Sequence, residues 1–206
     1  DARTGPVPEG NVGGGTGMVC FRFKGGIGTA SRRLDDRFTV GVLVQANFGV
    51  RQDLVIAGVP VGRDLNDLLP VMNSLSPGGE GNSMIGIVAT DAPLLPHQLK
   101  RLAKRVSLGM ARVGGLGRNS SGDIFLAFST ARKQESEAEG VSNVPMLSND
   151  RMDPILEATV QATEESIVNA LVAAETMSGI NNNLVYALPQ ERLRQLLRKH
   201  GRLAGE

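Results

Sequence analysis

Short apolar runs, rich in β-branched residues and bounded by glycine or polar turns, recur along the first two thirds of the chain. Runs of this kind, four to eight residues or so in length, are typical of buried β-strands. They predict strands at residues 18–24, 38–46, 52–57, 83–90 and 123–130.

The second half of the chain adds helical periodicity. From Pro96 onward, apolar residues recur every three or four positions, which predicts a helix with one buried face. That face carries Leu95, Leu99, Leu102, Ala103, Val106 and Met110. The opposite face carries the basic residues 100, 101, 104 and 105, which we interpret as a solvated surface or, as the less favoured alternative, an interface. Residues 133–149 are polar and acidic and predict an exposed loop.

Two more helices are expected near the C-terminus. Asp153 and Pro154 indicate a helix start, with aspartate as N-cap and proline at the first helical position. Gly179 is the predicted stop of this helix. A last amphipathic helix is expected over residues 190–200. Strands combined with long one-faced helices predict an α/β layered domain.

The composition of the chain excludes some classes of function. The 206 residues carry 22 basic and 21 acidic side chains, with 3% aromatics and no Trp. Such a balance predicts neither a nucleic-acid partner nor an anionic membrane surface. No apolar stretch is long enough for a membrane span, and no signal peptide is visible. The single cysteine, Cys20, excludes an internal disulfide and suits a reducing compartment, so a cytoplasmic location is expected.

The sequence gives no reason to expect a metal or cofactor. His97 and His200 lack partners at metal-ligand spacing, and Cys20 lies in an apolar run that predicts a buried side chain. The glycines of residues 13–17 are not followed by the Gly-Lys-Ser/Thr of a phosphate loop. Residues 26–28 and 115–117 lack the third glycine of a dinucleotide fingerprint. We interpret all three glycine segments as turns.

Residues 78–91, GGEGNSMIGIVATD, hold the most informative pattern. A glycine-rich loop leads into Ser83, which begins an apolar strand. If the Ser83 hydroxyl attacks the carbonyl of Asn82, the peptide becomes an ester that water can cleave. The new N-terminal serine then has an amine of pKa about 7.7–8.0 beside its own hydroxyl, so nucleophile and base belong to one residue. The plain alternative is an ordinary loop before a strand.

This loop resembles the processing site of the L-aminopeptidase/D-Ala-esterase-amidase family, which includes the β-peptidyl aminopeptidases. Four further segments resemble that family in the same order: GNVGGGTG (residues 10–17), VQANFG (44–49), SSGDIFLAFST (120–130) and ATEESI (162–167). The resemblance covers nearly the whole chain. It implies a four-layer αββα sandwich of the N-terminal-nucleophile type, with residues 1–82 and 83–206 as the two processed parts of one domain. It also implies a further segment before Asp1.

The resemblance implies catalytic roles for three polar residues. Ser121 and Asp123 lie two apart before an apolar run, and by themselves suggest only a turn. The family's auxiliary serine and acidic residue match them, although some members carry glutamate in place of Asp123. Asn47, which alone would be read as a turn former, matches the family's oxyanion-hole asparagine. Glu164 and Glu165, in the predicted long helix, are expected on its surface.

The sequence therefore predicts a self-processing hydrolase that removes the N-terminal residue from small peptides, amides or esters with a free amine. Ser83, Ser121, Asp123 and Asn47 are its expected catalytic residues, and homo-oligomers of processed units are expected. Two alternatives stay open. One is a related amidase for non-peptide oligoamides, and the other is a truncated relative that acts as a binding or structural module.

Overall fold

The computed structural model describes residues 5–35, 37–73, 83–131 and 143–203. Its centre is a four-stranded sheet in the order β3 (Gly26–Leu34), β4 (Phe38–Asn47), β5 (Ser83–Thr90) and β6 (Ile124–Ser129). The pairs β3–β4 and β4–β5 are antiparallel, whereas β5 and β6 are parallel. A parallel pair needs a crossover connection. Helix α2 (Pro96–Arg112) lies within that crossover.

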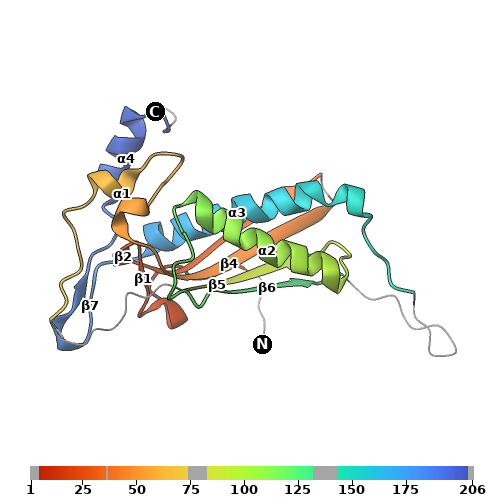
Figure 1. Ribbon diagram of the computed structural model, residues 1–206, viewed down its shortest axis with the longest axis horizontal. Coiled ribbons are helices and arrows are strands. Elements are labelled where there is room, and N and C mark those ends of the chain that lie inside the picture. The colour runs from red at the N-terminus through yellow and green to blue at the C-terminus, as the bar shows by residue number, and fades with distance from the viewer. Residues whose placement is uncertain (1–4, 36, 74–82, 132–142, 204–206) are drawn as a thin grey trace.

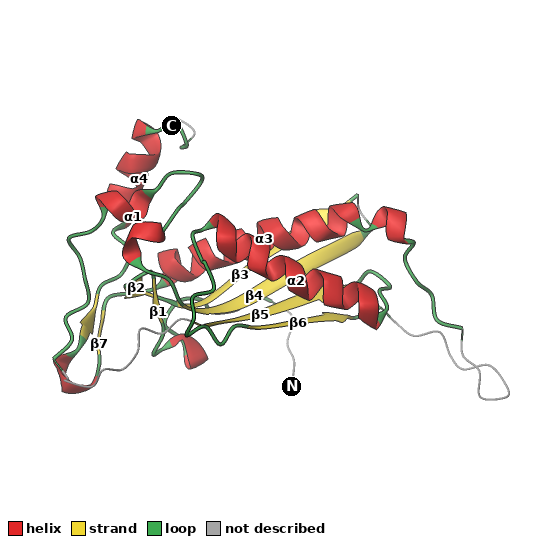
Figure 2. Ribbon diagram, viewed as in Figure 1, coloured by secondary structure: helices red, strands yellow, loops and turns green. Residues whose placement is uncertain are grey.

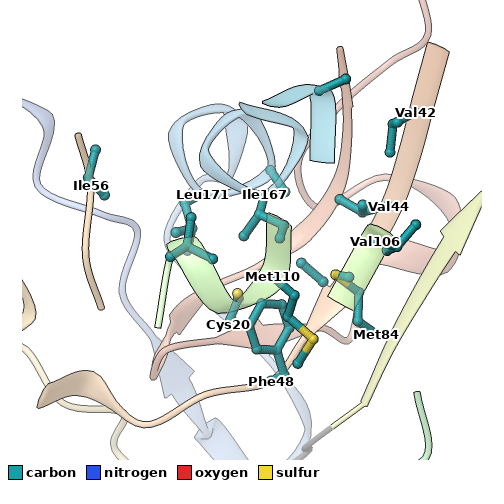
Figure 3. Packing of buried hydrophobic residues seen from close by; sticks show 14 of the residues in the cluster. Cys20, Val42, Val44, Phe48, Ile56, Met84, Val106, Met110, Ile167 and Leu171 are labelled. Atoms are coloured by element: carbon teal, nitrogen blue, oxygen red, sulfur yellow. The ribbon is translucent and has the colours of Figure 1, made fainter. Parts of the chain in front are cut away.

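Two long helices cover one face of the sheet (Figures 1 and 2). Helix α3 (Asp153–Ala173) packs on β3 and β4, and α2 packs on β6, on β5 and on α3. Alternate strand residues point toward these helices, as the pleat requires. On β4 they are Val40, Val42, Val44 and Ala46, and on β5 they are Met84, Gly86, Val88 and Thr90, all buried. Figure 3 shows part of this core, with Val44, Met84, Val106 and Ile167 among its members.

The sequence did not predict strand β3, because residues 26–28 were interpreted as a turn. That interpretation was wrong. The structure shows instead why glycine occurs in this strand. A Cβ atom on Gly28 would lie 1.9 Å from the Ser166 carbonyl oxygen of α3. The helix therefore lies directly on the strand backbone, and the glycine serves packing rather than turning.

Smaller elements surround the sheet. Strands β1 (Val19–Cys20) and β2 (Phe23–Lys24) form a tight hairpin within the predicted strand 18–24, and Phe21 and Arg22 at its turn have positive φ. Strands β7 (Met177–Ser178) and β8 (Leu184–Val185) form a second hairpin. The remaining elements are α1 (Val61–Asp64), α4 (Gln190–Lys199) and the 3-10 turns η1 (Gly13–Gly15), η2 (Arg51–Asp53), η4 (Asn149–Arg151) and η5 (Ile180–Asn182).

The single strand expected at residues 18–24 is therefore wrong, because the chain reverses within it to form the β1–β2 hairpin. Three further local predictions were also wrong. The expected strand at 52–57 is the 3-10 turn η2 followed by a single bridge between Ile56 and Val59. Helix α3 begins at Asp153 itself, so the aspartate lies in the first turn and not at the N-cap. The helix ends at Ala173 rather than at Gly179, because Ala174 is extended and the chain then enters β7.

Arg51 explains why residues 51–57 depart from a strand. Its guanidinium is fully buried and donates to the carbonyls of Phe21, Arg22, Leu65 and Leu68. The guanidinium carbon also lies 3.2 Å from the centre of the Phe23 ring, a cation–π contact. Burial lowers the pKa of Arg51 to about 10. One side chain thus ties the β1–β2 hairpin to the segment after α1.

The other face of the sheet is apolar but less covered. Ile85 on β5 and Ile124, Leu126 and Phe128 on β6 are 39%, 62%, 54% and 43% exposed. The α/β class is confirmed, and the described residues supply one helical layer and one sheet of the expected four-layer arrangement. No described helix has both the length and the apolarity that crossing a membrane demands.

Candidate functional site

The strand directions bring the predicted site residues to one edge of the sheet. Strands β5 and β6 are parallel, so their N-terminal ends lie together. Strand β4 is antiparallel to β5, so its C-terminal end reaches the same edge. Ser83 begins β5, Asn47 ends β4, and residues 121–123 immediately precede β6. Residues far apart in sequence therefore meet because of the topology alone.

Ser83 and Asn47 form a directly opposed pair at this edge. Their Cα atoms are partners in the antiparallel register. Their neighbours Met84 and Ala46 are fully buried under the helices, so Ser83 and Asn47 point to the opposite face of the sheet. Opposed side chains in such a pair have Cβ atoms about 4.5–5.5 Å apart. The pairing places an amide group beside the predicted nucleophile.

The Asn47 side chain is held in one orientation by the β1–β2 hairpin. Its Oδ1 accepts a hydrogen bond of 2.9 Å from the backbone N–H of Val19. An amide that uses its oxygen in this way presents its NH2 group on the other side. Neither N–H of the Asn47 amide has a partner among the residues that the structure describes, so both suit a developing negative charge on a substrate oxygen.

The loop before β6 contacts the nucleophile directly. The backbone N–H of Gly122 donates to Ser83 Oγ over 3.0 Å. Gly122 is exposed, and a Cβ atom there would lie only 3.2 Å from Ser83 Oγ. Ser121 and Asp123 are half-buried on either side of it. The strand begins at Ile124 rather than at residue 123 as expected, so Ser121 and Asp123 both belong to the preceding loop.

Asp123 contacts the residue after the nucleophile. Its Oδ1 accepts a hydrogen bond of 2.7 Å from the backbone N–H of Met84. A carboxylate that accepts from a backbone N–H makes a strong, charge-assisted hydrogen bond. Asp123 therefore fixes the start of β5, and with it the position of Ser83.

Ser121 has an unusual side chain. Its Oγ is buried and has no hydrogen-bond partner among the residues that the structure describes. An unpaired buried hydroxyl costs stability, about 1–3 kcal/mol, and such groups are rare outside functional sites. Ser121 lies one residue from Gly122, which contacts the nucleophile. Its unused hydrogen-bonding capacity is therefore at the edge where Ser83 lies.

Asn82 and the rest of the glycine-rich loop before it lie outside the described residues. Three backbone donors in the described geometry were not predicted, the N–H groups of Val19, Met84 and Gly122. A backbone donor leaves no mark in a sequence, because every residue except proline has one. Only the fold shows which of these donors reach the site.

The other candidate residues lie outside this cluster. Cys20 is fully buried, and burial raises the pKa of its thiol to about 12, which leaves it an inert core residue. His97 and His200 are exposed. Across residues 5–35, 37–73, 83–131 and 143–203, no group of three metal-ligating side chains occurs.

The glutamates of α3 form ion pairs within the helical layer. Glu164 pairs with Arg112 of α2 at 2.5 Å, and Glu165 pairs with Arg32 of β3 at 2.6 Å. These pairs join α3 to its neighbours on the face away from Ser83. Glu165 is exposed on the helix surface, as expected, whereas Glu164 is half-buried where α3 meets α2.

Comparison with known proteins is consistent with this geometry. A profile of Peptidase family S58 matches residues 1–185. The chain belongs to this family. It is 52% identical to a β-peptidyl aminopeptidase, BapA, of Sphingosinicella microcystinivorans over 98% of the chain and 54% of that protein. It is 46% identical to BapA of Sphingosinicella xenopeptidilytica over 96% of the chain and 52% of that protein.

Solved structures agree with the fold. The L-aminopeptidase D-Ala-esterase/amidase of Ochrobactrum anthropi, described as a variant of the Ntn-hydrolase fold, superposes with a TM-score of 0.86 at 49% identity. This match covers 98% of the chain and 55% of that protein. A β-aminopeptidase of Burkholderia gives a TM-score of 0.81 at 48% identity over 97% of the chain and 56% of that protein. The fold prediction is confirmed, and the chain spans about half the length of the relatives it matches.

Proposed function

We propose that this protein is a self-processing serine hydrolase that releases the N-terminal residue from small peptides, amides or esters. The observation that carries the proposal is the pairing of Ser83 with Asn47 at the sheet edge where Gly122 and Asp123 also make contacts. This arrangement combines a nucleophile, an oxyanion donor and two groups that fix the nucleophile. Membership of Peptidase family S58 supports the same chemistry.

Processing is the first step of the proposed mechanism. Ser83 Oγ attacks the carbonyl carbon of Asn82, the C–N bond breaks, and the acyl group passes from nitrogen to oxygen. Water then hydrolyses the ester. The products are a carboxylate on Asn82 and a free α-amine on Ser83. Residues 1–82 and 83–206 then form the two parts of one domain.

Catalysis repeats the attack on an external substrate. The neutral α-amine of Ser83 accepts the hydroxyl proton while Oγ attacks the substrate carbonyl. The Asn47 amide donates to the oxyanion of the tetrahedral intermediate. The ammonium group then gives its proton to the leaving amine or alcohol, and water releases the acid from the acyl-enzyme. Asp123, fixed against the Met84 N–H, supplies negative charge near the ammonium form.

The names of the relatives suggest the substrate class. Two are β-peptidyl aminopeptidases and one is an L-aminopeptidase that is also a D-Ala-esterase/amidase. Substrates with a free amine on the acyl part fit all of these names. The oligoamidase alternative uses the same serine and differs only in the acyl part it accepts. Assembly into oligomers of processed units and a cytoplasmic location remain predictions.

Intact mass of the purified protein tests the proposal. Wild-type protein is expected as two polypeptides, the second beginning at Ser83. Ser83→Ala is expected to remain one chain and to lose turnover of an aminoacyl anilide by more than about 10⁴-fold. Its melting temperature should change little, because Ser83 points away from the packed core. Cleavage at this bond in purified Ser83→Ala would disprove the mechanism, and a single unbroken wild-type chain would favour the non-enzymatic alternative.

Acylation of the substrate amine separates the remaining alternatives. An aminopeptidase should hydrolyse a dipeptide and its anilide but not their N-acetyl derivatives. An oligoamidase should prefer a synthetic amide oligomer over the dipeptide. These comparisons use the same wild-type preparation, so differences in folding do not affect them.

A further inference from the structure

Lys24 is a buried cation that the mechanism above does not use. Its side chain is 2% exposed, and its Nζ donates to the carbonyls of Met18, Gly15 and Gly25 over 2.5, 3.2 and 3.1 Å. All three protons of the ammonium group are thus directed at backbone oxygens. Burial of a charge is costly unless it is paired or fully hydrogen-bonded, and here neutral carbonyls surround it. Such an expensive arrangement calls for a physical explanation.

The Met18 carbonyl connects this cation to the candidate site. It belongs to the same peptide unit as the Val19 N–H, because the bond between Met18 and Val19 joins the two groups. That N–H is the donor that holds Asn47 Oδ1. The Met18 oxygen also accepts from the Gly25 N–H over 3.0 Å, so two donors fix the plane of this peptide. A continuous series of hydrogen bonds therefore runs from Lys24 Nζ to the side-chain amide of Asn47.

We propose that Lys24 is a positioning residue for the oxyanion hole, which orients and polarises the Asn47 amide through the Met18–Val19 peptide. This inference rests on the proposed function, in which Asn47 is the oxyanion donor. The ammonium draws electron density toward the Met18 oxygen, so the Val19 N–H becomes a stronger donor. The bond to Oδ1 then polarises the Asn47 amide in turn, and its NH2 group becomes a stronger donor to the oxyanion. Hydrogen bonds in such series strengthen one another.

The position of Lys24 on the β1–β2 hairpin also restrains the Asn47 side chain. Val19 and Lys24 are paired in the β1–β2 register, and the Lys24 backbone N–H donates to Tyr186 O over 2.7 Å. The lysine is thereby fixed at both its main chain and its side chain. Its three acceptors include Gly15 and Met18, on either side of the turn that precedes Val19. A substitution at Lys24 is therefore expected to disturb the position of Asn47 more than the packing of the helical core.

A double-mutant cycle tests the connection in the complete protein. Lys24→Met keeps the length of the side chain and removes the charge. We expect kcat for an aminoacyl anilide to fall by about tenfold or more, with KM changed by less than about twofold, because transition-state binding is the term affected. In the Asn47→Ala background, Lys24→Met should lower kcat by less than about twofold. An equal loss in both backgrounds, or no loss in the first, would overturn the proposal.

A second measurement leaves Lys24 unchanged and does not depend on activity. In ¹⁵N-labelled Ser83→Ala protein, which should have no free amine at residue 83, the Asn47 side-chain amide signals are followed against pH. Burial lowers the pKa of Lys24 to about 8, so the ammonium should lose its proton there and the Asn47 signals should shift with the same midpoint. Among the described residues, the titratable group that acts on Lys24 is Cys20, whose pKa of about 12 keeps it neutral across this range.

The Asn169 amide is the internal control for this titration. It donates to the Thr29 carbonyl over 2.8 Å and does not share the Met18–Val19 peptide. Its signals should stay constant while those of Asn47 move. Asn47 signals that stay constant across the pH range in which the Lys24 ammonium itself titrates would overturn the proposal, even if Lys24→Met failed to fold. Because this readout needs no substrate, it can fail while the hydrolase proposal stands, and it can succeed if the hydrolase proposal is wrong.

Discussion

The two faces of strand β5 differ in composition and in what they do. The face toward the helices carries Met84, Val88 and Thr90, each at most 2% exposed, and Gly86 where Val106 of α2 comes close. The other face begins with Ser83 and continues with the exposed Ile85. Burial of the first face supplies stability, at roughly 25 cal/mol per Å² of apolar surface. The second face is free to place polar groups at the strand end.

This difference indicates that stability and chemistry are separated by the pleat of a single strand. Residues one position apart, such as Ser83 and Met84, point to opposite faces. A substitution should therefore affect mainly activity on one face and mainly folding on the other. Substitutions on the two faces test that separation.

Among the residues that support Ser83, the largest effect on turnover is expected for Asn47→Ala. Loss of one oxyanion donor should lower kcat by about 10²–10³-fold, equivalent to about 3–4 kcal/mol. Stability should fall by only about 1 kcal/mol, through the lost hydrogen bond to Val19. Steady-state kinetics and thermal unfolding on the same preparation check both values. A large fall in melting temperature with nearly unchanged kcat would restore the interpretation of Asn47 as a turn former.

On the packed face, Gly28→Ala should destabilise the fold by about 3 kcal/mol or more, because its Cβ would overlap the Ser166 carbonyl. Gly41→Ala on β4 is the matched control. The nearest atom to its Cβ would be the Ala89 carbonyl oxygen, at 4.0 Å. This second substitution should change the unfolding free energy by less than about 1 kcal/mol. Equal denaturant midpoints for the two variants would contradict the close approach of α3 to β3.

A smaller effect is expected for Asp123→Asn. The asparagine oxygen can still accept from the Met84 N–H, but the negative charge near the Ser83 amine is lost. A nearby carboxylate favours the ammonium form, so its removal should lower the amine pKa and move the rising limb of the pH–rate profile to lower pH. Asp123→Ala, which also removes the acceptor, should in addition lower stability by about 1–2 kcal/mol. If the rate of wild type and that of Asp123→Asn rise over the same pH range, the carboxylate does not influence the Ser83 amine.

The smallest change in stability is expected for Ser121→Ala. Its Oγ is buried without a partner among the described residues, so removal of the hydroxyl eliminates a desolvation cost. The melting temperature should stay constant or rise while the rate falls, with little change in the pH limb because no charge is lost. A clear loss of stability would mean that the hydroxyl has a structural partner in solution.

Much of the secondary structure could be predicted from the sequence. Local periodicity was sufficient for β4, β5 and α2, where apolar spacing is regular and the ends are marked by glycine or proline. It failed for β3, because two glycines and a run of polar residues carry no strand pattern. The same local reasoning failed for the strand expected at residues 52–57, where the buried Arg51 organises the chain through carbonyls distant in sequence.

The candidate site, like the secondary structure, could be predicted only in part from the sequence. The sequence by itself predicted Ser83, Asn47, Ser121 and Asp123 as site residues, because their side-chain chemistry and the resemblance to a family are both local properties of the chain. Only the tertiary structure decided that Gly122 holds Ser83 Oγ, that Asp123 holds the Met84 N–H and that Lys24 is linked to Asn47. These contacts depend on backbone groups, which are the same in every residue. Their partners are therefore set by strand direction and register, which no single segment of the sequence contains.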